Sequence, residues 1–64
     1  MEFSDWLNRR LRELNKTQQD VADAICASKA SVSNWASGKM RPSRGYIEPL
    51  AQALEVAPEM LLEL

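Results

Sequence analysis

The sequence of 64 residues contains no histidine and only one cysteine, Cys26. Without histidine the chain has no imidazole base, no histidine-activated nucleophile and no histidine ligand for zinc. A single cysteine cannot form an internal disulfide, which fits a reducing compartment. The nine acidic residues show no pairing beside a phosphate loop or a metal cluster. We therefore expect no enzymatic activity, no catalytic residues, no metal site and no cofactor.

Long apolar runs are also missing. No segment approaches the roughly 18 apolar residues of a membrane span, and Met1 is followed by polar and charged residues rather than by a signal peptide. We expect no membrane partner, no small-molecule substrate and a cytoplasmic location. Hydrophobic residues make up 45% of the chain, enough for a compact core, and the length allows at most one domain.

Net positive charge, common in nucleic-acid-binding proteins, is absent, since the net charge is −1. The charges are unevenly distributed, however. Residues 9–44 hold all eight basic residues and three acidic ones, whereas residues 1–8 hold two acidic residues and residues 45–64 hold four. A basic middle between acidic ends favours a polyanionic partner. The alternative is chance clustering on a solvated face.

Apolar residues spaced three and four apart predict helices along most of the chain. We expect helices over about residues 4–14, 17–26, 28–36 and 44–55, and a short one that opens at Pro58. Pro49 lies near the start of the fourth helix, where proline is tolerable only if the helix begins late, near Glu48, or its first turn is distorted. Four or five short helices predict an all-α fold, a compact orthogonal bundle.

Helix-capping residues mark the middle two helices. Thr17 is a good N-cap, and Asp20 three residues later resembles a capping box with Asp in place of Glu. Ser28 is the N-cap that restarts the pattern, and Gly38 supplies the left-handed residue that ends the third helix. The sequence therefore predicts two short helices separated by a turn of about three residues, with the small Ala22 allowing a close crossing.

The third helix has an unusual outer face. Val32 and Trp35 are its bulky apolar residues and must face the core, which turns the opposite side outward. That side carries one long charged side chain, Lys29, among small polar residues. Such a face suggests that something packs against it, although a serine-rich helix could also be poorly optimised.

The pattern and the residues together resemble a known family. The runs TQQDVA at 17–22, SKASVSNW at 28–35, GK at 38–39 and RPS at 41–43 resemble the phage lambda repressor-like and Cro-like family, also called XRE-like. The runs LAQALEV at 50–56 and MLL at 60–62 resemble its last two helices. The resemblance extends from about Leu7 onward and includes a helix-turn-helix over roughly residues 17–37.

This resemblance implies a four- to five-helix DNA-binding domain over residues 1–64, either a whole protein or the N-terminal domain of a longer repressor. It implies a transcriptional regulator of the phage or prophage repressor type, acting in the bacterial nucleoid or in a phage-infected host cell. Its third helix would read double-stranded DNA. One such helix reads only a few base pairs, so we expect a homodimer on a pseudo-palindromic operator.

Site residues follow from the resemblance position by position. The positions that match the family's base-reading residues are Lys29, Ala30, Ser33 and Asn34. The positions expected to bind phosphate are Gln18, Ser28, Lys39 and Arg41, and we add Arg44 because it lies close to the same loop. Backbone amides at the helix starts near Thr17 and Ser28 would assist.

The chain departs from the family at two places. Cys26 stands where the family usually has glycine, at a turn position that often needs a positive φ, so cysteine there would cost roughly 1 kcal/mol or the turn differs. Leu11 and Ala36 stand where the family often has a paired Arg and Glu. Because both charged partners are replaced together by apolar groups, the change can be energetically neutral.

Two other readings compete with a repressor. One is an antitoxin or protein-binding helical module that uses Leu61, Leu62 and Leu64 to hold a partner, which is compatible with DNA binding. The other is an inert helical bundle, which does not explain why Lys39, Arg41 and Arg44 crowd beside the third helix.

Overall fold

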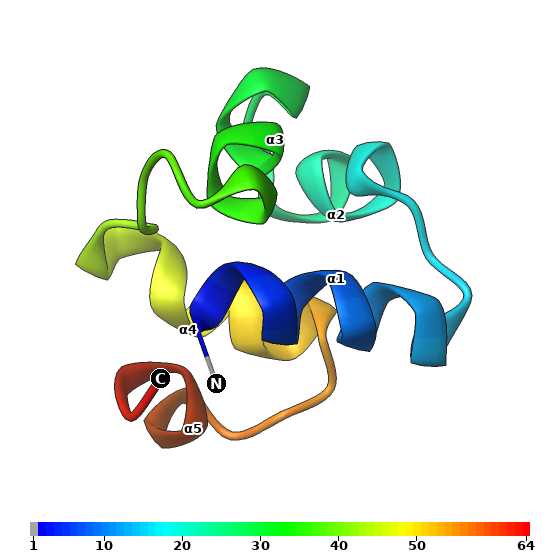
Figure 1. The fold of residues 1–64 in the computed structure, drawn as a ribbon. Helices are drawn as coiled ribbons and strands as arrows, with labels where there is room; N and C mark the ends of the chain where they lie inside the picture. The colour runs from blue at the N-terminus through cyan, green and yellow to red at the C-terminus, as the bar shows by residue number, and fades with distance from the viewer. Residues whose placement is uncertain (1) are drawn as a thin grey trace.

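Five helices form the protein in the computed structural model, which describes residues 2–64. They are α1 (Phe3–Leu14), α2 (Gln18–Ile25), α3 (Lys29–Ser37), α4 (Arg44–Ala53) and α5 (Pro58–Leu62). Figure 1 shows α2 and α3 together on one side of α1, and α5 on its other side. The all-α prediction is confirmed. None of the helices in this range is long and apolar enough to cross a bilayer.

One core unites the helices. The predicted stripe of α1 is buried at Phe3, Trp6, Leu7 and Leu11, and α4 adds Leu50 and Ala51. From the helix-turn-helix the core takes Val21, Ala22, Ile25, Val32, Trp35 and Ala36. The Trp35 ring also contacts Tyr46 at a centroid distance of 5.3 Å. The helix-turn-helix is therefore held through the inner faces of both its helices, which leaves their outer faces free.

The starts of α2 and α3 are capped as the sequence predicts. The Thr17 hydroxyl accepts a hydrogen bond from the Asp20 amide at 3.1 Å, and the Asp20 carboxylate accepts one from the Thr17 amide at 2.9 Å. The Ser28 hydroxyl accepts from the Ser31 amide at 3.1 Å. These bonds satisfy amides that have no partner within their own helix, so both helices begin at defined residues.

The carboxyl ends of α1 to α4 share one closing pattern. The residue with a left-handed backbone is Asn15, Cys26, Gly38 or Glu55, with φ between 55° and 84°. In each case the next residue's amide bonds back to a carbonyl five residues earlier, as from Ala27 to Ala22 at 2.9 Å. This Schellman arrangement turns the chain sharply at four places. Only one of the four positions is a glycine, so three carry a Cβ in a strained conformation.

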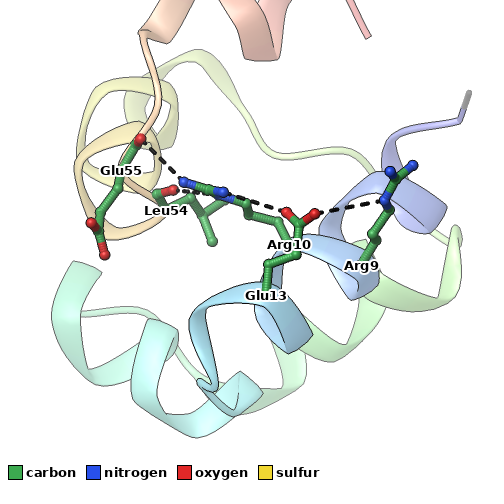
Figure 2. A network of polar contacts seen from close by, with 5 residues as sticks. All are labelled: Arg9, Arg10, Glu13, Leu54 and Glu55. Carbon is green, nitrogen blue, oxygen red and sulfur yellow. Dashed lines mark hydrogen bonds and ion pairs between the residues drawn. The ribbon is translucent and has the colours of Figure 1, made fainter.

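The carboxyl end of α4 is held by Arg10 on α1, whose contacts Figure 2 shows, and by Lys16, two residues beyond the end of α1. The Arg10 guanidinium donates to the carbonyls of Leu54 at 2.9 Å and Glu55 at 3.4 Å. Lys16 Nζ donates to the Ala53 carbonyl at 2.9 Å. The two cations thus satisfy carbonyls that the helix leaves unpaired, at the end of its dipole where positive charge is favourable. We refer to Arg10 and Lys16 as the α4 clamp.

The start of α4 at Arg44 agrees with the predicted span, and Pro49 lies in the interior of the helix, so the alternative of a late start near Glu48 does not hold. Proline removes one amide donor there and leaves the carbonyl of Gly45 without its usual partner. The predicted end of α4 needs correction: the helix ends at Ala53 rather than near Glu55, because Glu55 adopts the left-handed conformation that closes it.

The paired departure from the family is accommodated in the core. Leu11 and Ala36 are both buried. A polar link between α1 and α3 is made beside them by Asn8, whose side-chain amide donates to the Ala36 carbonyl at 2.8 Å. Apolar packing and one backbone-directed hydrogen bond therefore occupy the region where the family often places an ion pair.

Replacing Cys26 by glycine is expected to raise the free energy of unfolding by about 1 kcal/mol, because glycine accepts the left-handed backbone without a Cβ clash. In a domain of this size, that gain raises the Tm in a circular dichroism melt by about 4–8 °C. Cys26→Ala is the matched control, since alanine removes the thiol but keeps the Cβ. Equal stability of the glycine and alanine variants would contradict the strain assignment.

Replacing Arg10 by methionine is expected to lower the free energy of unfolding by about 1–2 kcal/mol, because charged hydrogen bonds to the α4 carbonyls are lost. Arg9 is the matched control: its side chain is 60% exposed and only forms an ion pair with Glu13 at 3.8 Å. Arg9→Met should therefore change stability by less than about 0.5 kcal/mol. Urea unfolding of both variants measures the difference, and similar losses would refute the α4 clamp.

Candidate nucleic-acid interface

The turn between α2 and α3 consists of Cys26, Ala27 and Ser28, as the sequence predicts. Cys26 has φ 58°, so the left-handed position expected at the family's glycine is present here with a cysteine side chain. Ala22 is fully buried where the two helices meet. A tight turn and a small residue at the crossing set α3 across α2 and present its outer face to solvent.

The outer face of α3 carries three of the four predicted base-reading residues. Lys29, Ala30 and Ser33 are exposed, whereas Val32 and Trp35 are buried on the opposite side. Lys29 and Ala30 occupy the first turn, immediately after the Ser28 cap. This face has one cation, no acidic residue and otherwise short side chains, so it can approach a partner closely.

The fourth predicted base-reading residue, Asn34, lies differently. It is only partly exposed, and its amide nitrogen lies 3.9 Å from the sulfur of Met40. Its backbone carbonyl accepts the amides of Lys39 at 3.0 Å and Met40 at 3.3 Å. Asn34 therefore supports the loop that follows α3, and its side chain is less open than those of the first turn.

Two predicted phosphate-binding residues lie at the helix starts. Gln18 is the first residue of α2 and is partly buried. Ser28 is exposed, but its hydroxyl already bonds to the amide and the hydroxyl of Ser31, the latter at 3.0 Å. A phosphate near Ser28 would therefore meet the unpaired amides of the first turn of α3 rather than a free serine hydroxyl.

The remaining predicted phosphate-binding residues belong to the loop after α3 and the start of α4. Lys39 and Arg44 are exposed, and neither forms an ion pair within residues 2–64. Arg41 is exposed as well, but it has partners within the protein: its guanidinium donates to the Leu64 carbonyl at 2.7 Å and lies over the Phe3 ring at 5.5 Å from the centroid. The three cations thus have different surroundings.

The structure divides the basic middle of the sequence into separate groups. Arg10 and Lys16 form the α4 clamp, and Arg9 pairs with Glu13. The cations beside the helix-turn-helix are Lys29, Lys39, Arg41 and Arg44. The sequence analysis did not single out Met40, which lies between Lys39 and Arg41 and is 58% exposed. A large apolar residue in an otherwise polar loop is the signal that could have marked it as a surface residue of this site.

The alternative of a protein-binding module relied on three leucines at the apolar carboxyl end of the chain, and the structure exposes only one of them. Leu61 is buried at 1% exposure, and Leu64 packs against the core. Leu62 alone is open, at 62% exposure. It lies at an open groove between α4 and α5 whose other apolar lining residues are Ile47, Pro49 and Pro58.

Residues 2–64 contain no cluster of three or more metal-ligating side chains. Comparison with known proteins then gives three findings. The sequence model of a family described as Helix-turn-helix matches residues 7–61. No curated protein sequence matches the chain. A solved structure of the P22 c2 repressor protein, in complex with synthetic operator 9T in the presence of Tl⁺, superimposes with a TM-score of 0.87 at 20% identity, covering 95% of this chain and 92% of that one. At this identity, the likeness shows the fold.

Proposed function

Since the chain belongs to the helix-turn-helix family of the lambda repressor-like, XRE type, we propose that it is a sequence-specific DNA-binding regulator of transcription. We propose a repressor of the phage or prophage type, whose α3 enters the major groove of an operator. The observation that carries this proposal is the exposed outer face of α3, formed by Lys29, Ala30 and Ser33 and flanked by the exposed cations Lys39 and Arg44.

The chemistry of this face fits a DNA groove. The major groove is about 12 Å wide, enough for one helix whose outward side chains are short. Lys29 can donate to guanine O6 and N7, and Ala30 can pack against a thymine methyl group. Both are in the first turn, the part of a recognition helix that reaches base edges. Ser33, one turn later, can donate to or accept from either base type.

Phosphate contacts would fix the position of α3 without reading sequence. In our proposal, Lys39 and Arg44 provide the charge, Gln18 provides a neutral donor, and the amides after Ser28 contact a phosphate at the start of α3. The acidic residues of the last twenty positions lie on α4, on α5 and in their connections. The charge separation seen in the sequence would then keep negative side chains away from the DNA backbone.

Two copies would act together. Because one α3 contacts few base pairs, a genomic site is selected only if two half-sites are read, with centres about 34 Å or one DNA turn apart. We therefore propose a homodimer on a pseudo-palindrome, with residues 1–64 serving as its DNA-binding domain. A regulator that acts on a bacterial or phage genome works in the cytoplasm, and this is the location we propose.

Binding-site selection from random duplex DNA tests the proposed function directly. The expected result is a pseudo-palindromic sequence whose half-site centres are one helical turn apart. Footprinting at saturation should then protect both halves. Failure to enrich any sequence would refute specific recognition, and protection of a single asymmetric half-site would refute the symmetric dimer.

A specific observation supports a second candidate, a protein-binding module of the antitoxin type. Leu62 is exposed and lines the groove between α4 and α5 together with Ile47 and Pro58. Such a module would form a stable complex with another protein that is insensitive to salt, whereas DNA binding weakens as salt rises. The two proposed sites meet at Arg44, which lines this groove, but otherwise use different residues, so the two functions can coexist.

Replacing Lys39 by alanine is expected to weaken binding to the selected operator and to random DNA alike. It should also reduce the magnitude of the slope of log K against log salt by about 0.9, because one phosphate contact is lost. Arg9→Ala also removes one positive charge, but from the groove between α1 and Met60 of α5, and should leave the slope unchanged. Fluorescence anisotropy titrations over a salt series give the slopes, and an unaltered slope for Lys39→Ala would remove this residue from the interface.

Replacing Lys29 by alanine is expected to reduce affinity for the operator by roughly 1–3 kcal/mol and to relax the preference at one base position, with little change on random DNA. Asn34→Ala is expected to give the smaller loss, because the Asn34 amide faces Met40. Both variants are titrated against the operator, its single-base variants and random duplex. Equal losses for Lys29→Ala on every sequence would make Lys29 a phosphate contact.

A further inference from the structure

Arg41 joins three segments that are far apart in the sequence. It lies in the loop between α3 and α4, and its Nη2 donates to the carbonyl of Leu64, two residues beyond α5, at 2.7 Å. The same guanidinium lies 5.5 Å from the centroid of the Phe3 ring, in the first turn of α1. One side chain thus connects the start of α1, the loop and the end of the described chain.

Both partners of Arg41 are themselves held in place. Phe3 is 3% exposed and contacts the Trp6 ring at a centroid distance of 6.1 Å. Leu64 is partly buried and packs against the core. A guanidinium is planar, so one face can stack on an aromatic ring while an edge donates to a carbonyl, which lysine cannot reproduce. The contacts of Arg41 therefore depend on its own shape and on an ordered surface.

The other end of the loop is fixed by α3. The amides of Lys39 and Met40 both donate to the Asn34 carbonyl, at 3.0 and 3.3 Å. The Lys39 side chain extends into solvent without a partner among residues 2–64. Arg41 is two residues further along, so the segment that presents Lys39 is attached to α3 on one side and to α1 and Leu64 on the other.

We propose that Arg41 is a positioning residue for DNA binding. It acts through Lys39, by attaching the loop to Phe3 and Leu64, and does not itself neutralise a phosphate. This role differs from the phosphate contact that family resemblance implies for Arg41. It rests on the proposed DNA-binding function, and it makes Leu64, two residues beyond α5, part of the support for the DNA-facing loop.

A phosphate contact and a positioning contact differ in their effects on two quantities, the affinity for DNA and the salt dependence of that affinity. Loss of a phosphate contact lowers affinity and reduces the magnitude of the salt slope by about 0.9. Loss of a positioning contact lowers affinity because the loop must be ordered on binding, but the number of neutralised phosphates is unchanged. Loop order is also visible without DNA, as hydrogen-exchange protection of the Lys39 and Met40 amides.

The experiment compares Arg41→Ala, Arg41→Gln, Phe3→Leu and Lys39→Ala in the full chain, using the operator from binding-site selection over a salt series. Thermal unfolding followed by circular dichroism identifies a temperature at which every variant is folded, and binding is measured at that temperature. Arg41→Ala is expected to weaken binding by about tenfold, the order of one charged hydrogen bond, with an unchanged salt slope. Arg41→Gln keeps a donor for Leu64 without the charge and should recover part of the affinity.

Phe3→Leu is the decisive variant, because Phe3 is buried and cannot contact DNA. It should weaken binding with an unchanged slope, and Arg41→Ala added to it should cause less further loss than in the parent protein. The Lys39 and Met40 amides should exchange faster in Arg41→Ala, while the Leu50 and Leu54 amides of the core keep their protection.

Two results would overturn the proposal. A salt slope reduced by about 0.9 in Arg41→Ala, equal to the Lys39→Ala effect, would make Arg41 a phosphate contact. Unchanged affinity in Arg41→Ala, despite a lower Tm, would restrict its role to stability. Neither result affects the proposed function, which fails if binding-site selection with the unmodified chain enriches no sequence, and this inference then fails with it.

Discussion

The arrangement of this domain depends on how the carboxyl end of α4 is held. That helix contributes the fully buried Leu50 and Ala51 and packs against both α2 and α5. Arg10 on α1 and Lys16, two residues beyond it, satisfy the last carbonyls at the end of α4, so α1, which packs against α3, is joined to the helix that packs against α2. The α4 clamp therefore links the helix that packs against α3 to the helix that packs against α2. Together with the shared hydrophobic core, it fixes how α2 and α3 lie relative to each other.

Because some of the cations hold the fold together, the net charge of the sequence is a poor guide to the charge of any one face. Two of the eight basic residues, Arg10 and Lys16, serve the interior architecture of the domain, and Arg41 holds the α3–α4 loop. The net charge of −1 therefore describes the outer face of α3 poorly. What matters is that Lys29 and Lys39 remain exposed around a helix face without carboxylates. The electrostatic potential at a surface, and its attraction of a charged partner, depend on this local distribution of charge rather than on the net charge.

Most of the fold could be predicted from local chemistry. Three predicted local features are present: the Thr17 capping box, the Ser28 cap and the left-handed turn at Cys26. The hydrogen bonds of each one join residues no more than five positions apart. The errors arose where distant segments decide. The apolar repeat could not show that Leu61 is buried by packing across the domain, or that α4 tolerates Pro49 in its interior. Local pattern also ended α4 too late.

In the candidate site, too, features set by local pattern could be predicted, and features set by distant contacts could not. Helical periodicity alone was enough to turn Lys29, Ala30 and Ser33 outward, because Val32 and Trp35 can face only the core. Nothing in the spacing indicated that Asn34 would support Met40, or that Arg41 would find Phe3 and Leu64. The Asn34 contact belongs to the local closure of α3 at Gly38, whereas the contacts of Arg41 with Phe3 and Leu64 join positions that only the folded chain brings together, beyond the reach of any helical or capping rule.

The closing bonds of α1 to α4 also bear on the route by which the chain folds. Each spans only five residues, as from Val56 to Ala51, and each turn is complete once its own helix has formed. Much of the structure is therefore specified by neighbours in sequence, which gives a low contact order. Helical domains of this kind reach the native state in microseconds to milliseconds. The long-range steps left for the end are the docking of α1 on α4 and the attachment of Arg41, so the loop beside α3 would be among the last parts to become ordered.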